Sequence, residues 1–176
     1  WMPDGTMLIV SMKDKKLLRF IDNTLSEVAD LSNLAGFHCN DMVVDDQGNA
    51  YIGNFGFNTY SGEEIRPANL ILVRPGEDPC LAADDLLFPN GTVITPDGKT
   101  LIVGETYAAR LTAFDINQDA TLSNRRVWAD FTLYADEGDI PLPDGMCLDA
   151  EGAIWVASPS TAEVIRVREG GVILDR

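Results

Sequence analysis

Apolar and polar residues alternate along this chain in short runs, and turn sequences separate the runs. The turns include Pro-Asp-Gly at 3–5 and 96–98, Asp-Gln-Gly at 46–48 and Ala-Glu-Gly at 150–152. Such alternation is typical of half-buried antiparallel β-strands, and no segment keeps a helical period over the ~11 residues that a helix would need. The pattern therefore predicts an all-β fold, with strands at 6–11, 15–21, 25–30, 40–45, 49–54, 69–73, 79–84, 90–95, 100–105, 109–116, 125–131, 145–149, 153–157, 162–168 and 171–175.

One phrase recurs three times and is followed each time by an apolar run. Its copies begin at Asn40, Asn90 and Asp144, and each reaches a turn glycine eight positions later. These leading residues lie 50 and 54 positions apart, and a partial copy opens the chain at residues 1–5. Four-stranded units repeated at such a period are typical of β-propeller blades. The sequence predicts one partial β-propeller domain over 1–176, with four-stranded antiparallel units at about 1–36, 37–86, 87–140 and 141–176.

The repeat also predicts a site. The first strand of each propeller blade lines the central channel, so Asn40, Asn90 and Asp144 are expected to converge at one end of it. Their amide and carboxylate oxygens suit Ca²⁺ or Mg²⁺, whereas zinc prefers His or Cys ligands, which the repeat does not offer. The alternative is that each residue caps a turn through its own side chain, as Asn and Asp often do before a strand.

Composition narrows the choice of partners. The formal net charge of −15 argues against nucleic acid, which demands a basic surface, and no apolar run is long enough to cross a bilayer. The three cysteines, Cys39, Cys80 and Cys147, have neither zinc-site nor disulfide-framework spacing. We therefore expect reduced thiols in a cytoplasmic protein, with Cys39 and Cys147 as small buried packing residues.

Three segments carry a family resemblance: NDMVVDDQGNAYIGNFG, FPNGTVITPDGKTLIVGETYAARLTAFDI and PDGMCLDAEGAIWVA. They resemble the gluconolactonase and regucalcin (senescence marker protein) group of six-bladed propellers, with squid-type diisopropyl fluorophosphatase and the paraoxonases as more distant relatives. The resemblance implies that about four of six blades are present. We therefore interpret the chain as a fragment of a longer reading frame, with open strand edges at both ends.

The resemblance also implies roles for the leading residues. In this family a divalent cation at the channel mouth is held by Glu, Asn and Asp, and a further Asn contacts the metal or the substrate. By motif, the resemblance implies that Asn90 is a ligand and that Asn40 is a ligand or substrate contact. It implies that Asp144 is a ligand that also acts as general base or positions the attacking water, and pure ligation is the alternative. The Glu belongs four residues before Trp1. His38 stands where the family carries an Arg that contacts substrate, which implies a different substrate or a different polar contact at this position. The alternative is that His38 only satisfies backbone groups of its loop.

The predicted function is a divalent-metal-dependent hydrolase that opens small sugar lactones, with Ca²⁺ as the first choice of cation and Mg²⁺, Mn²⁺ or Zn²⁺ as alternatives. The alternative is a non-enzymatic propeller that serves as a ligand-binding or protein-interaction scaffold. Glu105 and Tyr107 are placed either at the pocket rim or in ordinary blade contacts. Substrate identity, oligomeric state and the activity of the isolated 176 residues stay open.

Overall fold

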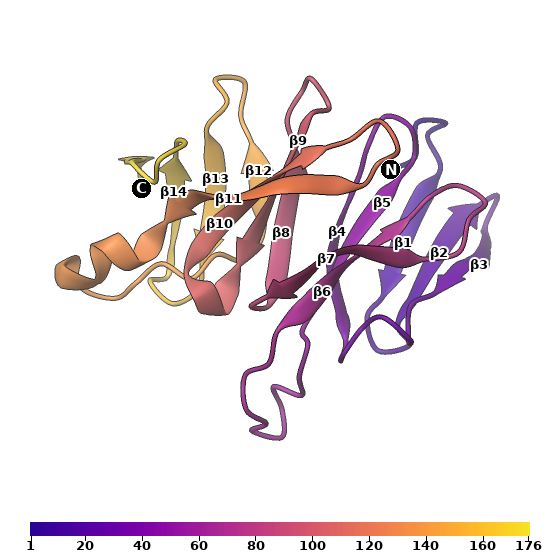
Figure 1. The fold of residues 1–176 in the computed structure, drawn as a ribbon, viewed down its shortest axis with the longest axis horizontal. Coiled ribbons are helices and arrows are strands. Elements are labelled where there is room, and N and C mark those ends of the chain that lie inside the picture. Colours follow the sequence, from indigo (N-terminus) through magenta and orange to yellow (C-terminus); the bar gives the residue numbers. More distant parts are fainter. The chain divides into compact units, whose positions relative to one another are not determined.

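The computed structural model describes residues 1–176, apart from the side chains of residues 136 and 137. The chain divides into two compact units, Trp1–Pro89 and Asn90–Arg176. Each unit consists of antiparallel sheets in which neighbouring strands follow one another along the chain (Figure 1). Such up-and-down sheets need only short turns between strands.

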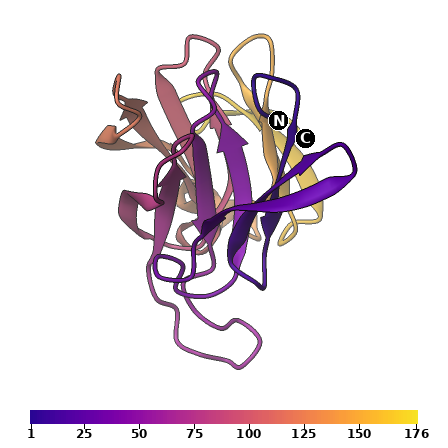
Figure 2. The same cartoon turned by 90° about the vertical axis from the view of Figure 1, so that its right-hand side faces the viewer.

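The first unit holds a three-stranded and a four-stranded sheet. The three-stranded sheet has the order β1-β2-β3 and the four-stranded sheet the order β4-β5-β6-β7. Their bounds are β1 Met7–Ser11, β2 Lys16–Ile21, β3 Thr24–Asp30, β4 Cys39–Val44, β5 Ala50–Asn54, β6 Ala68–Val73 and β7 Cys80–Leu86. The connection between β5 and β6 forms a long excursion beyond the end of its sheet, which Figure 2 shows from the side.

Two four-stranded sheets make up most of the rest of the chain. Their orders are β11-β10-β9-β8 and β12-β13-β14-β15, and β8 begins at the last residue of the first unit. Two 3₁₀ helices, η1 and η2, connect strands. The bounds are β8 Pro89–Ile94, β9 Thr100–Glu105, η1 Thr106–Ala108, β10 Arg110–Ile116, β11 Leu122–Asp130, η2 Phe131–Glu137, β12 Met146–Leu148, β13 Ile154–Ser158, β14 Glu163–Val167 and β15 Ile173–Asp175.

The turn after the first strand has the same construction in the second and the last sheet. In the second sheet, Asp45 Oδ1 accepts hydrogen bonds from the backbone N–H groups of Gln47 and Asn49, at 2.9 and 2.8 Å. In the last sheet Asp149 does the same for two backbone N–H groups of its own turn. The turn glycines all have positive φ, from 69° to 86°: Gly5, Gly48, Gly98 and Gly152. A short Asp side chain with a left-handed glycine is a standard means of reversing a strand.

Each unit has its own apolar core. In the first unit, residues of the three-stranded sheet such as Leu8 and Leu17 pack against Ile52 and Ile71 of the next sheet. In the second unit, Leu111 and Trp128 belong to one cluster with Ile154 and Ile165. Alternating side chains of each strand enter these cores, which is the physical cause of the alternation in the sequence.

The expected strands are all present, with ends that move by a few residues. Between the strands expected at 125–131 and 145–149 the chain forms the 3₁₀ helix η2, which the strand pattern does not predict. Cys39 is buried as expected, whereas Cys147 is exposed on β12, so its expected burial is wrong. The described residues contain no α-helix and no helix that could span a membrane.

Candidate cation and substrate site

Asn40 lies in a β-bulge. In the pairing of β4 with β5, Cys39 faces Asn54 and Met42 faces Ile52, so Asn40 and Asp41 together oppose the single residue Gly53. A bulge locally interrupts the ladder and re-aims the side chains at that point. The leading residue of this repeat is therefore held in an irregular position on an otherwise regular strand.

The amide of Asn40 is oriented by a backbone carbonyl. Its Nδ2 donates to the carbonyl oxygen of Pro89 at 3.3 Å. That carbonyl can approach because Gly53 has no side chain, since a Cβ there would lie 2.7 Å from it. A carbonyl only accepts hydrogen bonds, so the NH₂ end of the amide must face Pro89. The other end, Oδ1, accepts no hydrogen bond from the residues that the structure describes.

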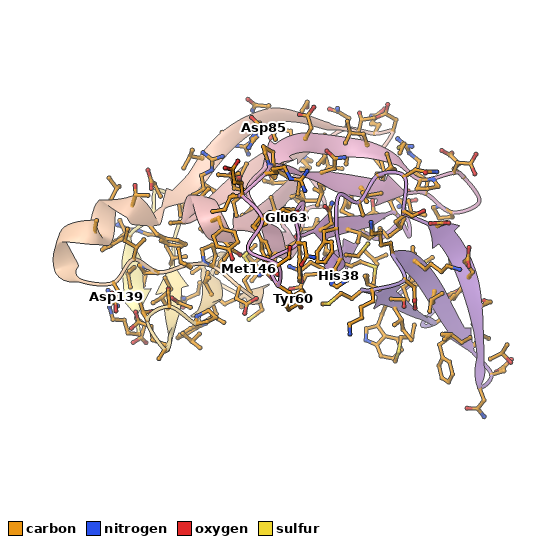
Figure 3. All side chains as sticks on the ribbon, turned by 90° about the horizontal axis from the view of Figure 1, so that it is seen from below. His38, Tyr60, Glu63, Asp85, Asp139 and Met146 are labelled. Atoms are coloured by element: carbon orange, nitrogen blue, oxygen red, sulfur yellow. The ribbon has the colours of Figure 1, made fainter. Side chains whose placement is uncertain are left out.

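His38 stands two residues before Asn40 in a group of aromatic rings. Its imidazole stacks on Phe37 with ring centroids 4.0 Å apart, and the centroids of Phe55 and Tyr60 lie at 6.0 and 5.9 Å. Figure 3 shows His38 and Tyr60 side by side. The Nδ1 atom of His38 is buried without a hydrogen-bond partner. His38 therefore presents a flat ring in apolar surroundings, unlike the guanidinium expected from the family pattern.

In the second unit, the starts of β8 and β12 approach closely. The backbone N–H of Gly91 donates to the carbonyl oxygen of Asp144 at 3.0 Å. A Cβ at position 91 would lie 2.4 Å from that oxygen and 2.7 Å from the nitrogen of Met146. Only glycine permits this contact. It brings the backbone of Asp144 next to the residue that follows Asn90.

Asn90 is 95% buried, and its amide has one hydrogen bond. Nδ2 donates to Oγ1 of Thr106 at 3.2 Å, and the Thr106 hydroxyl donates to the carbonyl oxygen of Pro143 at 2.7 Å. Pro143 directly precedes Asp144 in the chain. Among the described residues nothing donates a hydrogen bond to Asn90 Oδ1, so this oxygen is available to a ligand.

The carboxylate of Asp144 makes no hydrogen bond or ion pair with the described residues, although its backbone is held on both sides. Its N–H donates to the carbonyl of Ala157 at 3.0 Å, and its own carbonyl accepts from Gly91. Asp144 is half-buried. Its side chain is thus positioned by backbone contacts and is free to bind a ligand.

At each of the three repeated positions a side-chain oxygen therefore accepts no hydrogen bond from the part of the chain that the structure describes. Asn40 lies in the first unit, and Asn90 and Asp144 lie together in the second. Amide and carboxylate oxygens fit a hard divalent cation. No group of three or more His, Cys, Asp or Glu side chains suited to a metal occurs among the described residues. The convergence of Asn40 with the other two stays a prediction from the repeat.

Glu105 has a structural environment. Its carboxylate is fully buried and accepts from Arg110 Nε and Nη2 at 2.9 and 3.1 Å, with Thr112 Oγ1 and Arg125 also in contact. A buried carboxylate needs such partners, because desolvation without them would neutralise it. Glu105 therefore connects β9 to β10 and β11, which is the ordinary contact within a blade. Tyr107 is partly exposed in η1.

Sequence reasoning missed the residues that orient the two amides. Pro89 and Pro143 each directly precede a leading residue, so the phrase Pro-Asn-Gly at 89–91 and Pro-Asp-Gly at 143–145 contained a signal for the carbonyl acceptors. Nothing in the local sequence marks Thr106, because its contact with Pro143 spans 37 positions.

Comparisons with known proteins show the family of this chain. The family model described as the SMP-30/Gluconolactonase/LRE-like region matches residues 1–176. Regucalcin of Danio rerio is 28% identical over 149 residues, which cover 84% of this chain and 48% of that protein. Regucalcin of Xenopus laevis is 33% identical over 136 residues, covering 73% and 42% respectively. The chain spans about half the length of the curated relatives it matches.

Solved structures show the same fold. Regucalcin of Agrobacterium tumefaciens, a calcium-binding protein, superposes with a TM-score of 0.79 and 27% identity over 99% of this chain and 57% of its own. A gluconolactonase of Xanthomonas campestris gives a TM-score of 0.75 at 24% identity, over 97% and 58%. The predicted fold class, an all-β propeller of antiparallel blades, is confirmed. The chain belongs to the SMP-30/gluconolactonase/LRE-like family.

Proposed function

We propose that the full-length protein containing this chain is a divalent-cation-dependent hydrolase that opens small lactones, with sugar lactones as the first substrate class and Ca²⁺ as the cation. The observation that carries the proposal is that the side-chain oxygens of Asn40, Asn90 and Asp144, one at each repeated leading position, accept no hydrogen bond from the described residues. Membership of the family supports a lactonase-type hydrolase.

Asn90 and Asp144 are the proposed cation ligands of the second unit. Asn40 is the expected further ligand or substrate contact. When bound, the cation would polarise the lactone carbonyl and stabilise the negative charge that develops on its oxygen. The two proposed ligands stand near the starts of β8 and β12, which the hydrogen bond between Gly91 and Asp144 holds together. Their positions are therefore fixed before a ligand binds.

Asp144 is the proposed general base. Its carboxylate takes a proton from a water molecule as that water attacks the carbonyl carbon of the lactone. The ring C–O bond then breaks, and the ring oxygen leaves as the hydroxyl of the product hydroxy acid after it gains a proton. A carboxylate with no protein partner suits this role, because no ion pair has to break before it accepts the proton.

His38 is the proposed substrate contact in the first unit. Its stacked ring and the exposed Tyr60 beside it offer flat, mainly apolar contacts. Such a surface favours the carbon face of a lactone ring over a carboxylate or phosphate substituent. Small lactones that carry apolar substituents therefore belong in the substrate panel beside gluconolactone.

The test is proton release during lactone hydrolysis by the full-length protein, measured with Ca²⁺, after chelation and in the variants Asp144→Asn and Asp139→Asn. We expect Asp144→Asn to lower kcat/KM by about 10²- to 10⁴-fold, the usual size of a general-base contribution. Chelation should lower activity to the spontaneous rate. Asp139, an exposed acid of the preceding loop (Figure 3), is the matched control and should leave activity unchanged.

Hydrolysis at the spontaneous rate with every cation, in protein shown to be folded, would contradict the proposal and favour a non-enzymatic scaffold. Wild-type activity in Asp144→Asn would leave the hydrolase class standing but remove Asp144 from its centre.

A further inference from the structure

The hydroxyl of Thr106 lies between the two candidate ligands of the second unit. It accepts from Asn90 Nδ2 at 3.2 Å and donates to the carbonyl oxygen of Pro143 at 2.7 Å. Thr106 is the first residue after β9, and Gly104 of that strand allows Pro143 to approach, since a Cβ on Gly104 would lie 3.2 Å from the Pro143 ring. The end of β9 is therefore packed against the residue that precedes Asp144.

The protons of this arrangement can be assigned from chemistry. A threonine hydroxyl has one proton, and the Pro143 carbonyl can only accept, so that proton points to Pro143. The Thr106 oxygen can then only accept from Asn90. The amide of Asn90 must turn its NH₂ group toward Thr106 and its Oδ1 away, even though the two ends of an amide have nearly the same shape.

We propose that Thr106 is a positioning residue for cation binding: through its bond to Pro143 it selects the Asn90 rotamer that presents Oδ1 to the cation. The inference rests on the proposed function, which supplies the cation. Asn40 has the same requirement and meets it differently, because its NH₂ group bonds a carbonyl directly. Asn40 donates to the carbonyl of Pro89, the residue before Asn90. Asn90 is linked through Thr106 to the carbonyl of Pro143, the residue before Asp144. In each case a proline carbonyl determines which end of the amide faces the ligand.

The alternative is that the Thr106 hydroxyl has a purely structural role and only connects the end of β9 to the segment before β12. Both roles lower stability when the hydroxyl is lost, so stability alone does not separate them. The orientation role has a further consequence. Without the Thr106 acceptor, Asn90 can present its NH₂ end, which repels a cation.

The experiment measures Ca²⁺ binding to metal-free full-length protein by titration calorimetry, with melting temperature recorded beside it. Thr106→Val should weaken Ca²⁺ binding about 10- to 100-fold, as loss of partners behind metal ligands usually does. Thr106→Ser retains the hydroxyl and should bind within about 3-fold of wild type. Thr95→Val is the matched control, because Thr95 also donates a hydroxyl proton but lies in the turn after β8, at the opposite end of the strand from Asn90.

A double-mutant cycle separates the effect of amide orientation on Ca²⁺ affinity from the effect of the substitution on folding. Asn90→Asp places oxygen at both ends of the side chain, so it cannot be turned the wrong way. We expect Asn90→Asp to improve Ca²⁺ affinity at least about 10-fold more in the Thr106→Val background than in wild type. Equal effects in the two backgrounds would overturn the proposal. If Thr106→Val does not fold, Thr106→Ala takes its place in the same cycle.

Failure of this inference and failure of the proposed function are distinguishable. A wild-type protein that binds neither Ca²⁺, Mg²⁺ nor Mn²⁺ would overturn both. A wild-type protein that binds Ca²⁺, with a folded Thr106→Val variant that binds it as tightly, would overturn only the role of Thr106.

Discussion

At the scale of single residues, the candidate site depends on which end of each amide faces the protein. Asn40 and Asn90 each use the NH₂ group in a bond to a fixed acceptor and keep the oxygen free. The same side chains in a turn cap would have bonded a nearby backbone N–H through that oxygen, as Asp45 does. The difference separates a ligand-binding role from a structural one for residues of the same type.

Cys39, beside Asn40 in the sequence, tests the environment of the first unit. Burial raises the pKa of its thiol from 9.0 to about 11. Because the folded thiol ionises at higher pH than the unfolded one, the stability that this burial contributes is present below pH 9 and lost as pH rises toward 11. At pH 8 we expect iodoacetamide to leave Cys39 unmodified in native protein and to modify it in urea, as read by peptide mass spectrometry.

The partly exposed Cys80 is the internal comparison and should react in the native state at a measurable rate. Native modification of Cys39 as fast as that of Cys80 would show that the strand start beside Asn40 opens readily.

At the scale of elements, the site depends on how closely β8 approaches the start of β12. The bulge in β4 and the close backbone approaches at Gly53 and Gly91 are departures from regular sheet geometry. The bulge and Gly53 accompany Asn40, and Gly91 follows Asn90. Regular strands would present their side chains in simple alternation. The irregular backbone is what allows a proline carbonyl or an aspartate carbonyl to reach the neighbouring strand.

Replacing Gly91 by Ala should separate these elements. The new Cβ would lie 2.4 Å from the Asp144 carbonyl oxygen, so the backbone has to move. We expect a loss of about 1–3 kcal/mol in the free energy of unfolding, measured by urea denaturation, as is usual for overpacking. Ca²⁺ affinity should also fall, because Asp144 moves with its backbone.

Gly145→Ala is the matched control for this substitution. It lies next to Asp144, its φ is not in the left-handed region, and an added Cβ meets no atom within 4 Å. It should change stability by no more than about 0.5 kcal/mol. Equal losses in the two variants would show that flexibility of the segment, and not the close contact, causes the effect.

At the scale of the whole molecule, the dominant property is charge. The chain carries 28 acidic and 13 basic side chains, for a formal net charge of −15. Many of its ion pairs join groups with substantial exposure, such as Lys16 with Glu27 and Arg66 with Glu63. Exposed pairs of this kind contribute little each, so repulsion between the excess acids outweighs them.

Salt should therefore stabilise this protein. We expect the urea midpoint of the purified chain to rise when NaCl increases from 10 to about 200 mM, because the Debye length falls from ~30 Å toward ~8 Å and repulsion is screened. KCl at equal concentration should act alike, since screening is not ion-specific. A midpoint that falls with salt would show that the ion pairs outweigh the repulsion.

The strands, the turns and the repeat can be predicted from local sequence. Alternation predicts the buried faces, the Pro-Asp-Gly, Asp-Gln-Gly and Ala-Glu-Gly phrases predict turns, and the period of the leading residues indicates propeller blades. These features follow from neighbours within about ten positions, where backbone preference and side-chain alternation act directly. The start of η2 was missed, because its Tyr134 hydroxyl bonds Gly171 from 37 positions away.

The contacts that hold the candidate ligands arise from the three-dimensional fold. The bulge at Asn40, the contact of Gly91 with Asp144 and the bridge from Asn90 through Thr106 to Pro143 join positions 13 to 53 residues apart. The burial of Glu105 among arginines and the exposure of Cys147 also depend on which sheet face each strand finally presents. Hydrogen-bond direction and close packing are set by three-dimensional neighbours, and short-range sequence preferences do not encode them.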